Sequence, residues 1–542
     1  MDQGSAPISQ RRGLLRFLSE RARSALPPLP PGGRLAASVQ HLRSRLWLLL
    51  VLLASCAVYV YFVSAGGLKS WPVYGVYLDW QADAFRAGHT YLHLKPAPEL
   101  VRAADPYNNV NIRYWALDLS YFRGKYYCYW GPIPSLIQAA VKALLRINRD
   151  IGDQYIGLFS ACLTAVSGGL IIDRMGRRLF GAVPRILIIF GILAFALANP
   201  MLHSVTTAGT YLSAILAGQA FLIAGVLVAF DAVWYAGTSS ARPHRLLLAG
   251  LLWAFATASR VTVLPTVAVL IGTTALAEGW VSERRWLRVL VNSLWLGMPV
   301  AIAGVSLLAY NKLRFDDPLE FGLKLQLSGY PRLERFEARF WLPNLYSYVL
   351  RPFAFTCQFP YVYQEWRVDP ANAFPSFIAL PTGNYNMDEP VVGWLRAVPI
   401  SWFIGFAALL VPRPLALRFR HGRVYLWCLV SFAALASLTG LTALGVYATT
   451  MRYLADITPG LVLLALLGAF ALRASRFGQV ASKLTSTAII LLASVTIVMG
   501  CLLGYQGYNG HFHKYNPTLD AAFVKALSFC GDSKPDMPRF WP

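Results

Sequence analysis

The feature that most constrains this chain is a series of long apolar stretches separated by short polar segments. The stretches run to roughly 18–25 residues, the length that a helix needs to cross about 30 Å of hydrocarbon. Hydrophobic residues make up 56% of the chain and charged residues 14%, whereas a soluble domain carries about 25% charged residues. The mean hydropathy is +0.47. The sequence therefore predicts an all-α integral membrane protein.

Eleven of the stretches are long or apolar enough to be predicted as membrane spans. They cover residues 46–64, 154–172, 185–199, 211–235, 246–259, 261–276, 289–309, 394–411, 424–447, 453–472 and 485–505. The fifth and sixth are short, and they predict a broken hairpin around Arg260.

The positive charge of the chain predicts its orientation. The formal net charge is +23, and the Arg and Lys residues gather in alternate loops, which are expected to be cytoplasmic. With an odd number of spans, the N-terminus is then cytoplasmic and the C-terminus extracytoplasmic. A basic stripe with interleaved aromatic residues is absent from the sequence, which argues against nucleic acid as a partner.

This orientation divides the chain into five parts. They are a cytoplasmic basic tail (1–45), a transmembrane module (46–309) with a first outer loop (66–153), a second outer loop (310–393), C-terminal transmembrane helices (394–505) and an extracytoplasmic tail (506–542). Residues 12–23 of the basic tail predict either an amphipathic helix on the membrane surface or a disordered segment.

Residues 132–145 are apolar, but they are too few for a span. Counting them as a span would invert the charge pattern of the loops that follow. They are predicted to form a helix in the outer interface, with Lys142, Arg146 and Arg149 near lipid head groups. Three cysteines, Cys128, Cys357 and Cys530, fall on the predicted outer side, where two of them can form a disulfide.

Acidic residues in the first outer loop are the candidates for a catalytic base. Asp79 and Asp83 are four residues apart, so they share one face of a helix. A carboxylate just outside the membrane can take a proton from an alcohol. Asp79 is preferred because it lies nearer the first span, and Asp118 ranks third. The alternative is a solvated helix with two ordinary surface acids.

Three basic residues are candidates for binding a phosphate. Lys125 is followed by several tyrosines, and Arg452 opens the tenth span one helical turn before Asp456. Arg260 lies between the two short spans, and an arginine at membrane depth is a candidate functional residue. The alternatives are an interfacial aromatic belt around Lys125, an ion pair within one helix for Arg452, and an Arg260 that reaches up to the interface.

Several local strings resemble the GT-C superfamily of polytopic glycosyltransferases, and most of all its protein O-mannosyltransferase and aminoarabinose transferase branch. The resemblance extends to the first span, the acidic first outer loop and the long loop after the seventh span. The strings, which also resemble a bacterial subgroup, are Ala82-Asp83-Ala84-Phe85, Gly124-Lys125-Tyr126-Tyr127, Gly131-Pro132-Ile133-Pro134, Pro318-Leu319-Glu320-Phe321-Gly322 and Arg452-Tyr453 with Asp456. The Asp-Glu pair usual in the family's first outer loop and the Trp-Trp-Asp motif of oligosaccharyltransferases are both absent from the sequence.

The resemblance implies an extracytoplasmic transfer of one sugar from a polyprenyl-phosphate donor to an acceptor hydroxyl, in a bacterial inner membrane. It implies inversion at the anomeric carbon and no metal or organic cofactor. Implied substrate-binding residues are Tyr126, Tyr127, Trp130, Glu320, Tyr453 and Asp456. A transporter or flippase and a non-catalytic membrane scaffold are the rival classes, and the acceptor stays open between glycan, lipid and protein.

Overall fold

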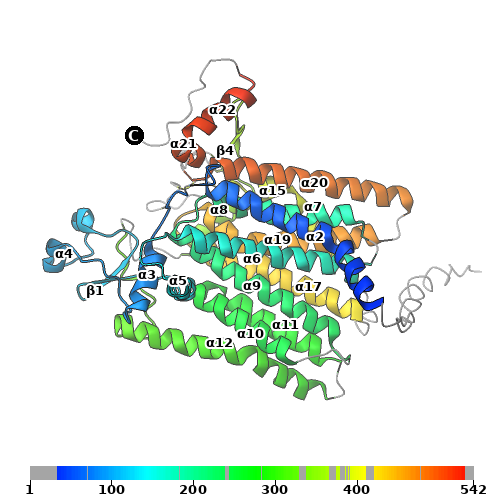
Figure 1. Ribbon diagram of the computed structural model, residues 1–542, viewed down its shortest axis with the longest axis horizontal. Helices are drawn as coiled ribbons and strands as arrows, with labels where there is room; N and C mark the ends of the chain where they lie inside the picture. Colours follow the sequence, from blue (N-terminus) through cyan, green and yellow to red (C-terminus); the bar gives the residue numbers. More distant parts are fainter. Residues whose placement is uncertain are drawn as a thin grey trace, which may run out of the picture. The chain divides into compact units, whose positions relative to one another are not determined.

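The computed structural model describes residues 33–69, 71–181, 183–238, 243–281, 284–328, 337–364, 374–378, 385, 389, 391–410, 420–475, 478–508 and 510–530. The chain divides into two units, Met1–Leu50 and Val51–Pro542. In the first unit, the described residues form the beginning of helix α2. The second unit holds every other element (Figure 1). The amphipathic helix predicted within residues 12–23 lies outside the described residues.

The described chain is mostly helical with almost no sheet, which confirms the predicted class. The longer helices are α2 (Gly33–Val63), α3 (Tyr77–Arg86), α5 (Ile133–Leu144), α6 (Gln154–Arg174), α7 (Arg185–Leu197), α9 (Thr210–Tyr235), α10 (Pro243–Ser259), α11 (Leu264–Gly279), α12 (Arg285–Phe315), α13 (Trp341–Val349), α17 (Arg420–Ser437), α19 (Met451–Ala474), α20 (Gln479–Gln506) and α22 (Pro517–Leu527).

Shorter pieces connect or extend these helices. They are α4 (Pro98–Arg102), η2 (Asn109–Tyr114), η3 (Met175–Leu179), α8 (Met201–Thr206), η4 (Val261–Val263), η5 (Ala338–Phe340), α15 (Trp394–Ala397), η6 (Pro399–Phe403), α16 (Ile404–Leu409), η8 (Leu438–Gly440), α18 (Leu441–Leu444) and α21 (His511–Tyr515).

Eight helical segments among the described residues are long and apolar enough to cross a membrane. They lie on α2, α6, α9, α11, α12, α17, α19 and α20. The other three predicted spans fall on α7, on α10 and on the broken series α15–η6–α16, all of which are shorter. Each of the eleven predicted stretches is thus helical over most of its length, while the number that cross a membrane stays a prediction.

Small residues let the helices of the second unit pack closely, as membrane helices do in the absence of a hydrophobic driving force between them. Helix α19 lies at the centre, with 94% of its most apolar window buried. At Gly460 of α19, a Cβ atom would lie 2.4 Å from the backbone nitrogen of Ala436 on α17. Any larger residue at Gly460 would therefore push α17 and α19 apart.

The helix predicted in the outer interface is present as α5, and Figure 1 shows it almost end-on, across the direction of the bundle helices. Its apolar residues Leu136, Val141 and Leu144 are exposed. The prediction that Lys142 lies among lipid head groups is wrong, because this side chain is fully buried within the protein. The reason is a pair of carboxylates on α3, described below.

The outer loops also contain two small antiparallel hairpins that the sequence did not predict. Strand β1 (Ser120–Phe122) pairs with β2 (Lys125–Tyr127), and Tyr121 lies opposite Tyr126. Strand β3 (Ala354–Phe355) pairs with β4 (Val362–Tyr363). Of the three outer cysteines, Cys357 and Cys530 form a disulfide, and Cys128 is a buried free thiol.

Candidate functional site

The segment after strand β2 is held against the end of helix α10 by a close backbone approach. A Cβ atom at Gly131 would lie 2.1 Å from the carbonyl oxygen of Ala258. From the other side, buried Arg314 of α12 donates a hydrogen bond to the carbonyl oxygen of Cys128 at 2.6 Å. These contacts fix the position of Tyr129 and Trp130, whose rings stack at 4.1 Å.

The amide side chain of Gln326 links Asp118 to Tyr211, whose ring contacts Trp130. Gln326 Nε2 donates to Asp118 Oδ1 at 3.1 Å and to the Tyr211 hydroxyl at 3.0 Å. Asp118 is partly exposed and has a φ of 66°, a backbone conformation that is uncommon for residues other than glycine. The hydrogen bond from Gln326 therefore holds the carboxylate of a partly exposed residue beside Tyr211.

Arg452 lies over the ring of the same tyrosine. Its guanidinium carbon is 4.5 Å from the centre of the Tyr211 ring, a cation–π arrangement. The edge of the Tyr211 ring also meets Trp130, with 4.7 Å between ring centres. Tyr211 thus connects a carboxylate, Asp118, with a cation, Arg452, for which the sequence predicts two different roles.

The two ionic residues at the start of α19 each pair with a different part of the chain. Arg452 Nη2 is 2.7 Å from Glu389 of the second outer loop. Asp456 Oδ2, one turn deeper, is 2.6 Å from Arg260 Nη2. The ion pair between Arg452 and Asp456 that spacing alone suggested is therefore replaced by these two tertiary pairs. The break predicted at Arg260 is confirmed, since α10 ends at Ser259.

Several buried polar atoms in this region have no hydrogen-bond partner. They are Nε of Arg260, Nε of Arg452 and Oδ1 of Asp456. Buried polar atoms are nearly always satisfied in folded proteins, and exceptions often mark a site for a water, an ion or a ligand. Two guanidinium groups with spare donors suit a phosphate, because the planar fork of arginine matches phosphate oxygens.

Asp79 has a different environment from the one expected for a base. Its side chain is fully buried, and Oδ1 accepts hydrogen bonds from Gln138 and Lys142, both at 2.9 Å. Oδ2 accepts from the backbone nitrogens of Ile151 at 2.7 Å and Gly152 at 3.3 Å. With both oxygens occupied, Asp79 ties α3 to α5 and to the loop that leads into α6.

Lys142 is the cation between the two first-loop carboxylates. Its ammonium is 2.9 Å from Asp79 and 2.6 Å from Asp83. Burial opposes the charge on Lys142, but the hydrogen bonds that its ammonium donates to both carboxylates outweigh this effect, so the pKa of Lys142 is raised. Asp83 remains one-third exposed and also meets Arg86 at 3.2 Å. The sequence spacing predicted that Asp79 and Asp83 share one helix face. Their negative charges are neutralised by Lys142 of α5.

A second buried carboxylate organises the same region. Asp153 accepts hydrogen bonds from the backbone nitrogens of Leu78 and Asp79 at the start of α3, and from the hydroxyl of Thr210 at the start of α9. Burial raises the pKa of Asp153 to about 6, although these hydrogen bonds oppose the shift. Asp153 thus fixes α3 against the first turn of α9, one residue before Tyr211.

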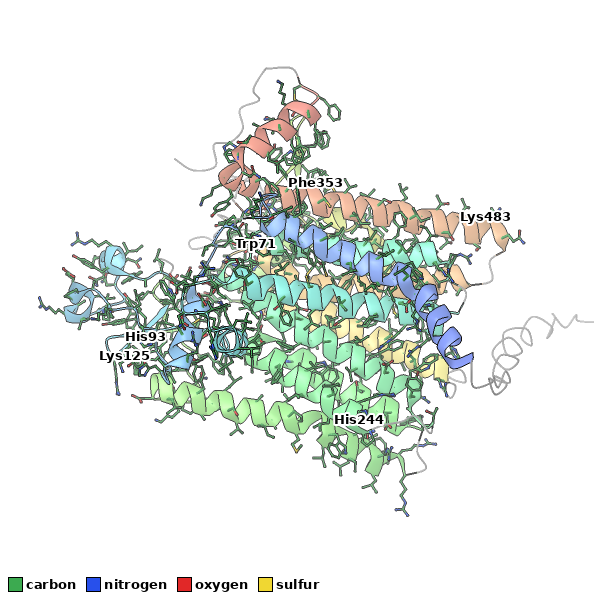
Figure 2. The ribbon with its side chains drawn as sticks, in the orientation of Figure 1. Trp71, His93, Lys125, His244, Phe353 and Lys483 are labelled. Atoms are coloured by element: carbon green, nitrogen blue, oxygen red, sulfur yellow. A yellow bond between two sulfur atoms is a disulfide. The ribbon has the colours of Figure 1, made fainter. Side chains whose placement is uncertain are left out.

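The other predicted residues divide between the site and its surroundings. Lys125 lies at the far end of the β1–β2 hairpin, over the ring of Tyr91 at 3.9 Å, and Figure 2 shows it beside His93 away from the helical bundle. Tyr126 and Tyr127 are buried in the packing of this hairpin. Glu320 accepts from the backbone of Gly322, within its own turn.

Trp130 contacts the Tyr211 ring, over which Arg452 lies. Tyr453 follows Arg452 in the chain. Tyr129, Tyr211, Gln326 and Glu389 were missed by the sequence reasoning. Tyr211 and Gln326 lie in segments that appear ordinary, a span and a loop, and no local signal distinguishes them. The aromatic density around Tyr129 was noticed, but it does not show which ring faces the site.

One acidic group in the described chain has the spacing of a metal site. Single carboxylate oxygens of Asp79, Asp83 and Asp150 lie within 4.8 Å of one another. Lys142 already lies 2.9 Å and 2.6 Å from the first two, so its ammonium supplies the positive charge that a cation would bring. The arrangement fits an ion-paired structural contact better than a metal centre.

Comparisons with known proteins find a likeness in three solved structures. Neither a family model nor a curated protein matches the chain. The solved structures are of the oligosaccharyltransferase of Archaeoglobus fulgidus, AglB: in the apo form (13% identity, TM-score 0.42), tethered to an acceptor peptide (11%, 0.43), and with an inhibitory peptide and a dolichol-phosphate (12%, 0.42). The matches cover 85–86% of this chain and 56% of the solved ones, so this chain corresponds to just over half of their length.

Proposed function

We propose that the protein is a membrane glycosyltransferase that moves a monosaccharide from a polyprenyl-phosphate donor to an acceptor hydroxyl. The observation that carries the proposal is the arrangement around Tyr211: Gln326 links the partly exposed Asp118 to the Tyr211 hydroxyl, and Arg452 lies over the Tyr211 ring. Arg260 pairs with Asp456, which lies one turn along α19 from Arg452. A base and two phosphate-binding groups are what a transfer from a sugar phosphate needs. The motifs that resemble the GT-C superfamily agree with this chemistry.

In the proposed reaction, Asp118 takes the proton of the acceptor hydroxyl as its oxygen attacks the anomeric carbon. The bond between that carbon and the phosphate oxygen breaks, and the electron pair leaves with the polyprenyl phosphate. The guanidinium groups of Arg452 and Arg260 stabilise the charge that develops on this leaving group. Attack from the face opposite the phosphate inverts the anomeric carbon.

We propose Asp118 as the base in place of Asp79 because of their hydrogen bonds. Asp79 is buried and has four donors on its two oxygens, so taking up a proton would break its ion pair with Lys142. Asp83 is also paired with Lys142. Asp118 accepts from the neutral amide of Gln326 and lies beside the tyrosine that Arg452 covers.

The test is a transfer assay with purified protein in nanodiscs. The donors are undecaprenyl phosphates that carry a radiolabelled hexose or pentose, with envelope glycans, lipids and peptides as acceptors. We expect one donor to release polyprenyl phosphate as the label appears on an acceptor. Movement of an intact labelled donor between leaflets of a vesicle, without cleavage of any donor, would instead identify a flippase.

We also propose that the site faces the extracytoplasmic side of a bacterial inner membrane. The site lies where α10 ends and α19 begins, and the Arg-rich loops lie at the opposite ends of these helices. A reporter that is active only in the periplasm should be active after Asp317 and after Cys530, and inactive after Gly478. The reverse pattern would invert the orientation, and activity at all three positions would contradict the predicted topology.

A further inference from the structure

At the end of the bundle opposite the candidate site, a cavity of about 170 Å³ lies between α9, α10, α11 and α12. Figure 2 labels His244, the neighbour of its lining residue Pro243, at this end. One face of α12 lines the cavity with Arg288, Val291, Asn292 and Trp295, which are spaced as helix neighbours. We infer that this cavity binds the head group of phosphatidylethanolamine.

The cavity contains a buried carboxylate with a nearby cation. Glu278, at the end of α11, has 8% of its surface exposed and accepts a hydrogen bond from the amide of Asn292. Arg288 Nε lies 3.5 Å from the same carboxylate oxygen, and the Arg288 side chain is half exposed. Arg423 of α17 is a second cation within electrostatic range of Glu278.

This mixture of charges selects a zwitterion. Glu278 repels a ligand that is only anionic, and the two arginines repel one that is only cationic. An ammonium joined to a phosphate satisfies both, with the ammonium on Glu278 and the phosphate on the exposed part of Arg288. A primary ammonium can donate three hydrogen bonds, whereas the trimethylated ammonium of phosphatidylcholine donates none.

The surroundings of the cavity point to a lipid and away from a soluble molecule. A cavity of about 170 Å³ is below the roughly 300–1,000 Å³ of usual small-molecule sites, so it holds a small polar group and leaves the rest of the ligand outside. Trp280 and Trp286 are exposed on either side of the α11–α12 turn, as in a belt at head-group level. Beyond them, Leu290 and Leu294 of α12 are exposed, where acyl chains would lie.

The test is a titration of the detergent-purified full chain with dioleoyl phosphatidylethanolamine, phosphatidylcholine and phosphatidylglycerol, followed by native mass spectrometry. We expect the ethanolamine lipid to bind at least about tenfold more tightly than the other two, because a charge-assisted hydrogen bond contributes about 1.5–3 kcal/mol. Glu278→Gln should remove this preference. The matched control is Glu337→Gln, because Glu337 is an exposed partner of Arg339 in the second outer loop.

A second variant covers the case in which Glu278→Gln does not fold. Ala232→Leu narrows the cavity from α9 and leaves the carboxylate in place, and it should also abolish the preference. A preference for phosphatidylethanolamine that survives in both variants, or that is absent from the wild type, overturns the inference. Equally tight binding of soluble O-phosphoethanolamine would assign the site to a soluble ligand and overturn the inference that the ligand is a lipid. The measurement involves no sugar transfer, so its outcome is independent of the proposed enzyme activity.

Discussion

Asp118→Asn is expected to lower the rate of sugar transfer by about 10²–10⁴-fold, the usual contribution of a general base. Asparagine keeps the size of the side chain and an oxygen that can accept the hydrogen bond from Gln326 Nε2, but it cannot take the proton of the acceptor. The measurement is the release of labelled polyprenyl phosphate at saturating donor, with the thermal unfolding of each variant recorded alongside.

The two other acids of the first outer loop provide the controls for Asp118. Asp83→Asn should retain most of the activity. Asp79→Asn should mainly destabilise the protein, by about 3–5 kcal/mol, because it leaves Lys142 buried with only half of its negative partners. If Asp118→Asn transfers sugar at the wild-type rate while folded Asp83→Asn does not, the base lies on α3 and the assignment to Asp118 is wrong.

Arg452→Lys is expected to reduce transfer by about 10²–10³-fold, the cost of removing one group that stabilises charge in the transition state. Lysine keeps the charge but loses the planar fork. In Arg452, Nη2 of this fork pairs with Glu389, and Nε has no hydrogen-bond partner. Arg452→Ala should be worse still. The same labelled-donor assay measures both, with KM reporting on phosphate binding in the ground state and kcat on the leaving group.

Lys125→Ala is the matched control for Arg452, because sequence reasoning gave the two residues the same role. The structure places Lys125 over Tyr91 at the tip of the hairpin, so its loss should change kcat and KM by less than about twofold, as for an ordinary surface substitution. Equal activity of wild type, Arg452→Ala and Arg452→Lys would reduce Arg452 to a structural anchor of α19.

The helices could be predicted from the sequence because the bilayer imposes a length and a composition on each span separately. The break at Arg260 was equally readable, since a charged residue interrupts an apolar run. The interruption of residues 394–411 into α15, η6 and α16 was missed. Pro399, the first residue of η6, does not by itself show whether a membrane helix stops or only bends.

The site was less predictable, because its contacts join residues far apart in the chain. Spacing placed Asp79 and Asp83 on one helix face correctly, but it could not show that Lys142, some 60 residues later, lies between them. Spacing also suggested that Arg452 pairs with Asp456, whereas each has a partner on another element. Arg452 and Arg260 were named as candidates from residue type and position, and Trp130 from the resemblance. The contacts of Arg260 with Asp456 on α19, and of Arg452 and Trp130 with Tyr211, are properties of the fold.

The disulfide between Cys357 and Cys530 has a consequence for how the protein matures. It closes a loop of chain with a sequence separation of 173 residues, and Glu389, Arg452 and Asp456 all lie inside that loop. Cys530 is translated after every one of these residues, so the covalent ring forms only after the segment that contains Cys530 has been made and, in the proposed topology, has reached an oxidising compartment. Until then the second outer loop, which supplies the partner of Arg452, lacks one of its covalent restraints. In the proposed topology, completion of the candidate site is thereby coupled to export of the segment that contains Cys530.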